Sequence, residues 1–552
     1  MSETAVTSLE NLRARTLEWI TDDPDPASRD ELYRLLDDLP ASTDELTDRF
    51  SGRLVFGTAG LRGPVRAGPH GMNRAVVRSA AAGLVSWLDS QAAAGPVVIG
   101  YDARHGSADF AEETARVVTG SGRQALVMPR PLPTPVLAFA VRRLEAVAGV
   151  MVTASHNPPA DNGYKVYLGK ALGGADGNGA QIVAPVDARI EQAIDDLGSL
   201  SQIPLGDTGT VLDESIVEDY LSAATSVIDR DDPKELATVA TPMHGVGGSV
   251  LVAAMERAGF AAPTLVPDQA EPDPDFPTVA FPNPEEPGAM DRLIDLARSS
   301  TADLAIALDP DADRCAVAVP DGQGWRALTG DELGILLADH LIRKGRPGVY
   351  ATTIVSSSLL RALCEARGVE YRETLTGFKW IVRAAEDLAF GYEEAIGYCV
   401  APQHVRDKDG ISAALLTCEI AAGLRAALQG LPDRLDELAR EFGVYRTAQL
   451  SVRVEDLRDI TDAMSRLRQD LPTTLLDEPI IEHTDLAPGA DVVTLRTAGC
   501  RVVVRPSGTE PKLKAYLEVI EPVDGDDVTA ARERAGAALE ALRTEVALAL
   551  GL

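Results

Sequence analysis

Three aspartates stand at alternate positions in LDPDADR, residues 308–314, directly after the apolar run ADLAIA. Carboxylates this close repel one another unless a cation neutralises them. Oxygen ligands of this kind suit Mg²⁺, and the segment lacks the glycine and distal glutamate of a calcium-binding EF-hand loop. A solvated acidic turn is the alternative in a chain with 84 acidic residues. The preceding strand and the adjacent Arg314 favour a metal site formed by Asp309, Asp311 and Asp313.

A second polar segment, TASHNPPADNGYKVY at residues 153–167, presents Ser155 just after the apolar run AVAGVMV. No G-x-S-x-G elbow surrounds this serine, and His156 is its immediate neighbour, so a hydrolase triad is not indicated. The serine could instead carry a phosphoryl group, with Mg²⁺ and a lysine stabilising the oxygens that are transferred. The alternative is a turn-rich loop after a strand.

Three further regions offer groups that bind phosphates or sugars. In RPSGTEPKLKAY (505–516), glycine permits close backbone approach, and hydroxyls, amides and a guanidinium suit phosphate oxygens. This is not the P-loop pattern, so a nucleoside triphosphate is not implied. In GYEEAIGY (391–398), paired glutamates could accept hydrogen bonds from sugar hydroxyls, while TGFKW (376–380) and VRDKDG (405–410) each place a lysine in a polar turn. Hairpin turns or exposed acidic turns are the alternatives.

Lysine is scarce in this chain, which makes its placement informative. Five of the eight lysines fall inside the polar segments described above: Lys165, Lys379, Lys408, Lys512 and Lys514. A generic solubilising role would not favour such placement. These lysines are therefore candidates for binding anions.

The elements that must position these segments follow an alternating pattern from about residue 75 onward. Helices are expected at 78–91 and 107–122, and strands at 95–104 and 147–157. Short apolar strands that alternate with helices indicate α/β units with mostly parallel sheets. Ligands bind outside the carboxyl ends of such strands, and the polar segments stand at these positions.

The two ends of the chain differ from this pattern. Residues 1–50 read as helices, and the segment SRDELYRLLDDL opens with Ser28 as a helix cap. The tail suggests a smaller α+β unit. Joints rich in proline and glycine predict four domains: 1–206 with the N-terminal helices and the serine segment, 207–326 with the aspartates, 327–446 with the glutamate pair, and 447–552 with the RPSGTEP segment.

Composition limits the function classes. The net charge of −32 should repel nucleic acids and anionic membranes. No apolar run is long enough to span a bilayer, and the start of the chain lacks the features of a signal peptide. The five scattered cysteines indicate neither a disulfide framework nor a zinc–thiolate site. We expect a cytoplasmic protein, and a phosphate-binding site would have to be locally basic.

Taken together, TASHNP…NGYK, DPDADR, the glutamate-pair loop and RPSGTEPKLK resemble the motifs of the α-D-phosphohexomutases, in the same order and over about residues 50–520. The segments GTAGLRG and YEEAIG are most similar to the phosphoglucomutase-2/phosphopentomutase branch. The resemblance implies three related α/β domains with mixed, mostly parallel sheets, plus a C-terminal α+β domain. It also implies a heart-shaped enzyme around a central cleft.

The resemblance further implies a role for each segment. Ser155 would be the phosphoserine, and Asp309, Asp311 and Asp313 would hold Mg²⁺ together with the Ser155 phosphate. The other catalytic residues would be Lys408 as acid/base, Lys165 and Arg62 beside the phosphoserine, and His156 supporting the serine loop. The substrate-binding residues would be Glu393, Glu394, Thr376, Gly377, Lys379 and Arg314 around the sugar, and Arg505, Ser507, Gly508, Thr509 and Lys512 on the phosphate that is not transferred.

The expected activity is that of a phosphoglucomutase, which interconverts glucose 1-phosphate and glucose 6-phosphate with glucose 1,6-bisphosphate as the priming intermediate. The partner would be a small phosphosugar, with no nucleic acid or membrane, and the chain would be a monomer or homodimer. One departure matters: many family members have serine after the glutamate pair, where this chain has Ala395. Phosphopentomutase and phosphomannomutase activities therefore stay open, and a metal-dependent sugar phosphatase is a distant alternative.

Overall fold

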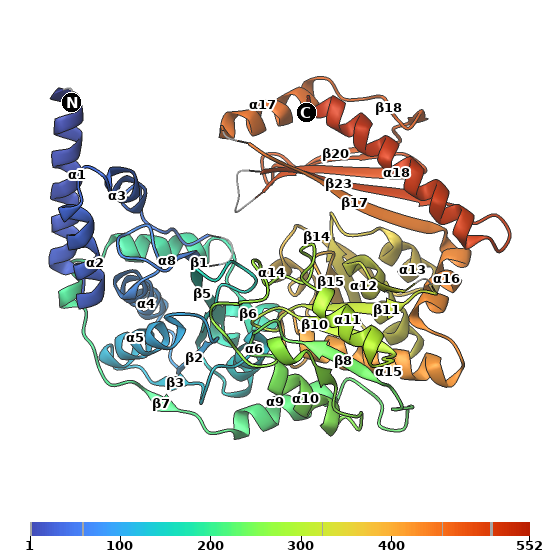
Figure 1. The fold of residues 1–552 in the computed structure, drawn as a ribbon, viewed down its shortest axis with the longest axis horizontal. Coiled ribbons are helices and arrows are strands. Elements are labelled where there is room, and N and C mark those ends of the chain that lie inside the picture. Colours follow the sequence, from blue (N-terminus) through green and yellow to red (C-terminus); the bar gives the residue numbers. More distant parts are fainter. Residues whose placement is uncertain (1–2, 58–59, 323, 455, 508–511, 552) are drawn as a thin grey trace. The chain divides into compact units, whose positions relative to one another are not determined.

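The computed structural model describes residues 3–57, 60–322, 324–454, 456–507 and 512–551. The chain divides into two compact units (Figure 1), each made of two segments of the sequence. The first unit comprises Met1–Ala327 and Gly397–Gly423. The second comprises Leu328–Ile396 and Leu424–Leu552.

Three N-terminal helices form a small subdomain in the first unit: α1 (Glu3–Asp22), α2 (Pro26–Asp37) and α3 (Thr43–Arg49). Their core is built by buried leucines, among them Leu12, Leu32 and Leu46. The expected cap at Ser28 is wrong. Helix α2 begins at Pro26, and the Asp25 carboxylate accepts from the Ala27 backbone N–H, because proline fits the first helical position and aspartate caps it.

The first α/β domain is built on a mixed sheet of seven strands, in the order β1-β5-β4-β2-β3-β7 with β6 beside β5. Strands β4, β2, β3 and β7 run parallel. Strand β5 pairs antiparallel with β4, and β1 pairs antiparallel with β5. The strands are β1 (Leu61–Pro64), β2 (Val97–Tyr101), β3 (Ala125–Val127), β4 (Ala148–Val152), β5 (Asp161–Leu168), β6 (Ala180–Gln181) and β7 (Thr210–Val211).

Helices cover both faces of this sheet. The main core joins alternate strand residues, such as Ile99 and Val150, to apolar side chains of α4, α5 and α8. On the other face, Gly100 and Gly149 leave room for Leu137 and Val141 of α6. The helices are α4 (Arg74–Ser90), α5 (Ser107–Gly120), α6 (Thr134–Arg143), α7 (Lys170–Gly177) and α8 (Val186–Asp195), with the 3₁₀ turn η1 (Leu200–Gln202).

The second α/β domain has a five-stranded sheet in the order β12-β11-β10-β8-β9. Strand β10 is parallel to β8 and antiparallel to β11, so the chain reverses after β10 in a tight turn. The elements are α9 (Ser215–Thr225), β8 (Thr238–Thr241), α10 (Gly248–Arg257), β9 (Thr264–Leu265), η2 (Pro267–Gln269), α11 (Asp291–Ser299), β10 (Leu304–Leu308), β11 (Cys315–Pro320) and β12 (Trp325–Ala327). Strand β16 (Gly397–Cys399) and most of α15 (Gly410–Ala426) also belong to the first unit.

The second unit starts with a third α/β domain, in which β13 pairs in parallel with β14 and with β15. Each of these strands ends in a polar loop, and helices connect the strands. The elements are α12 (Gly330–Arg343), β13 (Val349–Thr353), α13 (Leu359–Arg367), β14 (Tyr371–Thr374), α14 (Phe378–Ile381), β15 (Leu388–Glu393) and α16 (Leu431–Phe442).

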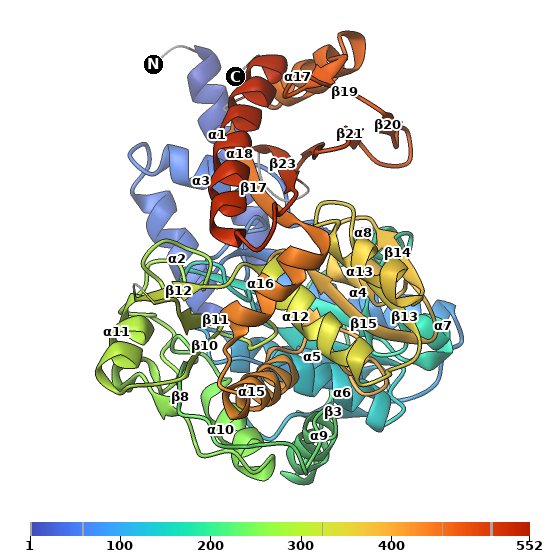
Figure 2. The ribbon, with the colours of Figure 1, turned by 90° about the vertical axis from the view of Figure 1, so that its right-hand side faces the viewer.

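The C-terminal part of the second unit is an antiparallel sheet in the order β17-β23-β22-β21-β20. Figure 2 shows α18 lying along strands β17 and β23, and its apolar residues share one core with them. The elements are β17 (Val444–Arg453), α17 (Leu457–Gln469), β18 (Thr474–Leu475), β19 (Glu478–Pro479), β20 (Glu482–Asp485), β21 (Val493–Arg496), β22 (Cys500–Pro506), β23 (Lys512–Glu521) and α18 (Val528–Leu550).

The predicted fold class of three α/β domains and a C-terminal α+β domain is confirmed. The heart shape, the central cleft and the domain boundaries after residues 206, 326 and 446 stay predictions. Among the described residues, no single helix is long and apolar enough to cross a membrane; α15 and α16, bent by 88° between them, pass the length and composition test only as a pair.

Two glycines test the packing described above. A Cβ at Gly149 would lie 2.3 Å from Val141 Cγ2, whereas a Cβ at Gly536 in α18 meets nothing within 4 Å. We expect Gly149→Ala to lower the free energy of unfolding by about 1–3 kcal/mol through overpacking. Gly536→Ala should raise it by about 0.5–1 kcal/mol, because alanine favours the helix. Urea unfolding measures both, and equal effects would contradict this packing.

Candidate active site

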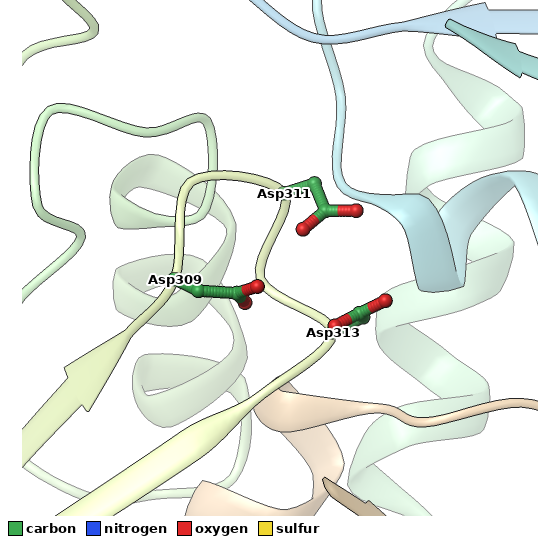
Figure 3. Close-up of side chains that lie close together, drawn as sticks. All are labelled: Asp309, Asp311 and Asp313. Atoms are coloured by element: carbon green, nitrogen blue, oxygen red, sulfur yellow. The ribbon is translucent and has the colours of Figure 1, made fainter. Parts of the chain in front are cut away.

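The three aspartates occupy the turn between β10 and β11, and their carboxylates point toward a shared space (Figure 3). All three side chains are buried, and one oxygen from each lies within 4.8 Å of the others. The turn is held by the Ala312 N–H, which donates to the Asp309 carbonyl over 2.8 Å. It is also backed by Gly245, where a Cβ would stand 2.3 Å from Pro310 Cα, so only glycine fits there.

Side chains from three other elements reach the aspartates. The Thr134 hydroxyl of α6 and Lys165 Nζ of β5 both donate to Asp311 Oδ2, over 2.6 and 2.8 Å. Lys165 Nζ also donates to Asp313 Oδ2 over 3.1 Å, and Lys408 Nζ lies 3.3 Å from the same oxygen. The remaining oxygens, Oδ1 of Asp311 and Oδ1 of Asp313, are buried and accept no hydrogen bond from the described residues.

The surroundings of the cluster shift the pKa values of two of its aspartates in opposite directions. Burial, followed by the charges of Asp311 and Asp313, raises the pKa of Asp309 well above its usual range. Burial also acts to raise the pKa of Asp313, but Lys165, Lys408 and Arg314 outweigh it and hold that pKa below the usual range. Oδ1 of Asp311 and Oδ1 of Asp313 are buried without a hydrogen-bond donor from the described residues, and the charged form of Asp309 is disfavoured. A hard divalent cation would bind such oxygens and neutralise the carboxylates, so the donor set fits a metal ion.

Ser155 lies at the edge of this cluster, in the loop after β4. The Ser155 hydroxyl donates to Asp309 Oδ2 over 3.0 Å. Ser155 Oγ also lies 3.1 Å from Nδ1 of His156. The side chain is buried, and the backbone adopts the left-handed conformation with φ of 52°. A hydroxyl in contact with a candidate metal ligand can carry a phosphoryl group that the same metal binds.

Basic groups surround the serine although the whole chain is acidic. Arg62 of β1 donates to the Asn157 side chain over 3.1 Å, and the Arg314 backbone N–H donates to Asp309 Oδ1 over 2.9 Å. Burial, followed by the charges of Arg314 and Arg62, lowers the pKa of His156 well below its usual range, so the imidazole is neutral at pH 7. This part of the site is locally basic, as phosphate binding requires.

Lys408 is held in a buried turn before α15 by its two acidic neighbours. Asp407 accepts from the Tyr167 hydroxyl over 2.8 Å and from the Gln181 side chain over 2.9 Å. Asp409 accepts from the Tyr220 hydroxyl over 2.8 Å and from backbone N–H groups at the start of α15. The turn is therefore fixed on both sides of the lysine.

The glutamate pair ends β15 in the second unit, and the two carboxyls have different surroundings. Glu394 Oε2 accepts from the Ser356 hydroxyl over 2.8 Å and from the Thr353 hydroxyl over 3.2 Å. Burial, then the charges of Glu393 and Asp331, raise the pKa of Glu394 to about 7. Glu393 is half-buried and stands at the last position of the strand.

The predicted residues near 376–380 span the end of the turn after β14 and the start of α14. Gly377 has φ of 113°, a conformation that suits glycine, and Thr376 is half-buried beside it. Lys379 is buried, with Nζ 5.8 Å from the centre of the Trp380 ring. Helix α14 thus carries one lysine beside an aromatic ring.

The hairpin between β22 and β23 carries the RPSGTEP segment, and Gly508 and Thr509 lie outside the described residues. The Ser507 N–H donates to the Lys512 carbonyl over 2.8 Å, which closes the hairpin. Arg505 stands directly opposite Lys514 in the ladder, so the two basic side chains share one face of the sheet.

Tyr516 brings the glutamate pair and this hairpin together. Burial raises the pKa of Tyr516, the nearby charge of Glu394 raises it further, and the Arg505 side chain hydrogen-bonds to the phenol. The glutamate pair and the hairpin between β22 and β23 therefore both lie near Tyr516 within the second unit.

Sequence reasoning missed several residues in these contacts. Lys514, in contrast, was among the lysines that the sequence already marked as candidates for binding anions. Thr134, Ser356 and Arg104, which donates to the carbonyl of Ser155 over 2.7 Å, gave no such signal, because their partners are distant in the chain.

Comparison with known proteins identifies the architecture. Models of the phosphoglucomutase/phosphomannomutase domains match in order: alpha/beta/alpha domain I at 53–200, domain II at 218–322, domain III at 329–442 and the C-terminal domain at 450–534. A probable phosphomannomutase from Haemophilus influenzae is 44% identical over 471 residues, which cover 83% of this chain and 96% of that protein. The chain belongs to the phosphoglucomutase/phosphomannomutase family. The resemblance to the α-D-phosphohexomutases is thereby confirmed, and the chain is a phosphosugar mutase of the isomerase class.

Other family members carry different sugars in their names. Mouse phosphopentomutase is 33% identical over 94% of this chain and 91% of its own length. A phosphoglucomutase from Staphylococcus epidermidis is 34% identical over 87% of this chain and 93% of its own length. The crystal structure of a putative phosphomannomutase from Thermus thermophilus matches with a TM-score of 0.67 and 25% identity, covering 89% and 99% of the two chains. The family relation gives the reaction type and leaves the sugar open.

Metal binding to the aspartate turn can be tested through stability. After chelation, Mg²⁺ at about 100 times its dissociation constant should raise the free energy of unfolding by about 2–3 kcal/mol. We expect Asp309→Asn to be more stable than the chelated wild type, because one of three repelling charges is gone, and to respond little to Mg²⁺. Thermal unfolding with and without Mg²⁺ measures this. The control Asp295→Asn, on an exposed side chain of α11, should respond like the wild type; an equal response in Asp309→Asn would refute the site.

The raised pKa of Glu394 predicts a pH dependence of stability. Its pKa is about 7 in the folded chain against an ordinary value of 4.5, so the folded state retains a proton that the unfolded state releases between these values. Stability due to this group therefore falls as pH rises through that window and is constant above it. Relative to the wild type, Glu394→Gln should gain on the order of 1–3 kcal/mol between pH 4.5 and pH 8.

Urea unfolding at both pH values measures this gain. The matched control is Glu365→Gln, at an exposed position on α13 in the same unit; its effect should stay within about 0.5 kcal/mol at either pH. A gain for Glu394→Gln that is the same at pH 4.5 and pH 8 would show that folding does not raise the pKa of Glu394.

Proposed function

We propose that this chain is a Mg²⁺-dependent phosphoglucomutase, which interconverts glucose 1-phosphate and glucose 6-phosphate through phospho-Ser155 and a glucose 1,6-bisphosphate intermediate. The observation that carries the proposal is the hydrogen bond from the Ser155 hydroxyl to Asp309, beside two buried carboxylate oxygens that accept no hydrogen bond from the described residues. The choice of glucose rests on the family resemblance and on the relative named phosphoglucomutase.

In this proposal Asp309, Asp311 and Asp313 hold Mg²⁺ together with the phosphate on Ser155. The ion supplies electrostatic stabilisation of the charge on the phosphoryl oxygens during transfer. Lys165 is already paired with two of the aspartates and keeps them in place. Arg62 and Arg314 add positive charge on the serine side.

The covalent steps follow from the chemistry of the serine. The bond between phosphorus and Ser155 Oγ breaks as a bond forms to the free hydroxyl of the sugar monophosphate, and that hydroxyl loses its proton. We assign the proton to Lys408, which accepts it as the neutral amine and gives it back to the sugar oxygen that is released in the return transfer. Its Nζ lies 3.3 Å from Asp313 Oδ2, at the same cluster. The bisphosphate then turns over and returns its other phosphoryl group to Ser155. His156 supports the serine loop as a neutral neighbour.

The second unit supplies the recognition of the sugar and of the other phosphate. We assign Glu393 to sugar hydroxyls, with Glu394, Thr376, Gly377 and Lys379 shaping the sugar side. The phosphate that is not transferred is assigned to Arg505, Ser507, Gly508, Thr509 and Lys512. Lys514 is added to this group because it stands opposite Arg505 on the same face of the sheet.

Phosphopentomutase is the second candidate, and a specific residue favours it. Ala395 provides no hydroxyl after the glutamate pair, so one contact to a hexose is missing, and the mouse relative that covers 94% of this chain is named a phosphopentomutase. Phosphomannomutase is the third, from the Haemophilus influenzae relative. A cytoplasmic location and a monomeric or homodimeric state remain predictions.

The phosphoserine assignment predicts the behaviour of Ser155→Ala. The variant should fold normally and lose mutase activity by at least about 10⁴-fold, because the covalent carrier is missing. Intact-mass measurement of the wild type after incubation with glucose 1,6-bisphosphate should show a gain of about 80 Da, absent in the variant. Substantial residual activity in Ser155→Ala would disprove the role. Release of free phosphate at the turnover rate would instead indicate the phosphatase.

The choice of sugar is tested by comparing kcat/KM for glucose 1-phosphate, ribose 1-phosphate and mannose 1-phosphate. We expect glucose 1-phosphate to be preferred by about tenfold or more, equivalent to about 1.4 kcal/mol in transition-state binding. A tenfold preference for ribose 1-phosphate would replace the glucose assignment by the pentose one. The variant Ala395→Ser, which restores the missing hydroxyl, should raise kcat/KM for the hexoses relative to ribose.

A further inference from the structure

Arg104, which follows β2 in the segment GYDARHGS, is one of the most thoroughly buried cations of the first unit. Its side chain is 1% exposed, and its guanidinium donates to four backbone carbonyls of the serine loop. Nη2 donates to the carbonyls of Ser155 and Asn157 over 2.7 and 2.6 Å, and Nη1 to those of Pro158 and Asp161 over 2.8 and 3.2 Å. One planar group thus holds the loop at both ends.

The orientation of the guanidinium is set from its other side by Asp102. Asp102 Oδ2 lies 3.4 Å from Arg104 Nε, and Oδ1 accepts from the Arg104 backbone N–H over 3.0 Å. The Ser107 hydroxyl donates to the same Oδ1 over 2.6 Å. The arginine is therefore fixed before it meets the serine loop, so little side-chain freedom is lost in holding it.

The serine at the centre of this loop has an unfavourable backbone conformation. With φ of 52°, Ser155 lies in the left-handed region, which a serine seldom adopts and keeps only where its surroundings enforce it. Its carbonyl is held by Arg104, its N–H donates to the Thr153 hydroxyl over 2.9 Å, and its own hydroxyl donates to Asp309. The two backbone contacts, with Arg104 and Thr153, orient the Ser155 hydroxyl toward Asp309.

One face of the Arg104 guanidinium is covered by a residue from the aspartate-bearing domain. The ring centre of Phe276 lies 4.8 Å from Arg104 Cζ, and Phe276 itself has φ of 45°. Next to it, the Asp275 carboxylate lies 2.7 Å from Nε2 of His105. An aromatic face over a guanidinium attracts it and excludes water, which strengthens its hydrogen bonds to the carbonyls. The domains that supply Ser155 and the aspartates therefore meet at Arg104.

We propose that Arg104 is a positioning residue for phosphoryl transfer: it holds the 155–161 loop so that the Ser155 hydroxyl faces the aspartates, with Phe276 as its cover. The proposal rests on the proposed role of Ser155 as phosphoryl carrier. Arginine suits this task because its fork donates several hydrogen bonds in one plane, which the single ammonium of lysine cannot do. A displacement of the serine oxygen by about 1 Å is enough to slow transfer by about 100-fold.

The test compares Arg104→Lys with Arg78→Lys, a matched control. Arg78 is a buried arginine of the same domain whose Nε donates to Glu113 over 2.5 Å, on helices α4 and α5 rather than at the serine loop. Arg104→Lys should lower kcat by about 100-fold while the dissociation constant of glucose 1-phosphate changes by less than about threefold. Arg78→Lys should lower the melting temperature and leave kcat per folded molecule unchanged.

Phe276→Leu covers the case in which Arg104→Lys does not fold. It keeps an apolar side chain and removes the aromatic face, and we expect kcat to fall by about tenfold at a near-native melting temperature. A kcat within about threefold of wild type in either folded variant overturns the role of Arg104. Equal losses of kcat per folded molecule in the Arg104 and Arg78 variants also overturn it, because they would show a general structural effect. Ser155→Ala separates the two proposals: if it keeps activity, the phosphoserine assignment fails, whatever Arg104 does.

Discussion

Repulsion among three buried carboxylates is the constraint on which the first unit depends. Asp309, Asp311 and Asp313 end a buried strand within 4.8 Å of one another, and such a cluster is unstable without positive charge around it. Two lysines supply this positive charge: Lys165 of β5, which pairs with Asp311, and Lys408 of the turn before α15, which pairs with Asp313. Both are distant from the aspartates in sequence. The sheets and helices of the unit hold these two lysines close to the aspartate turn.

The local chemistry of the site was predictable, and its long-range support was not. The aspartate triplet and the loop after β4 could be read from the sequence because their residues are close together in the chain and follow apolar strands. Thr134 and Arg104 look ordinary in sequence, and they matter because folding brings them to Asp311, 177 residues away, and to Ser155, 51 residues away. The start of α2 was misjudged because a serine inside the helix resembled a cap more than the Asp25–Pro26 pair did.

The reaction and the sugar depend on different kinds of evidence. In the proposed function, phosphoryl transfer draws on the charges of the aspartate turn and of the cations around it. Relatives named for different sugars are all mutases. In the proposed function, the choice of sugar depends on a few hydrogen bonds near Glu393 and Ala395, each of which contributes little free energy on its own. Because Tyr516 lies near both Glu394 and Arg505, a change of the loop that carries the glutamate pair also changes the surroundings of the hairpin between β22 and β23.

The contact between Gly245 and Pro310 bears on which cation the turn accepts. Backbone lies against backbone there, with no side chain that could yield, so the turn is not free to dilate. Calcium needs six to eight oxygens at about 2.3–2.6 Å, whereas magnesium needs a tighter shell at about 2.0–2.1 Å. In the proposed metal site, a turn of fixed width would therefore favour the smaller magnesium ion over calcium.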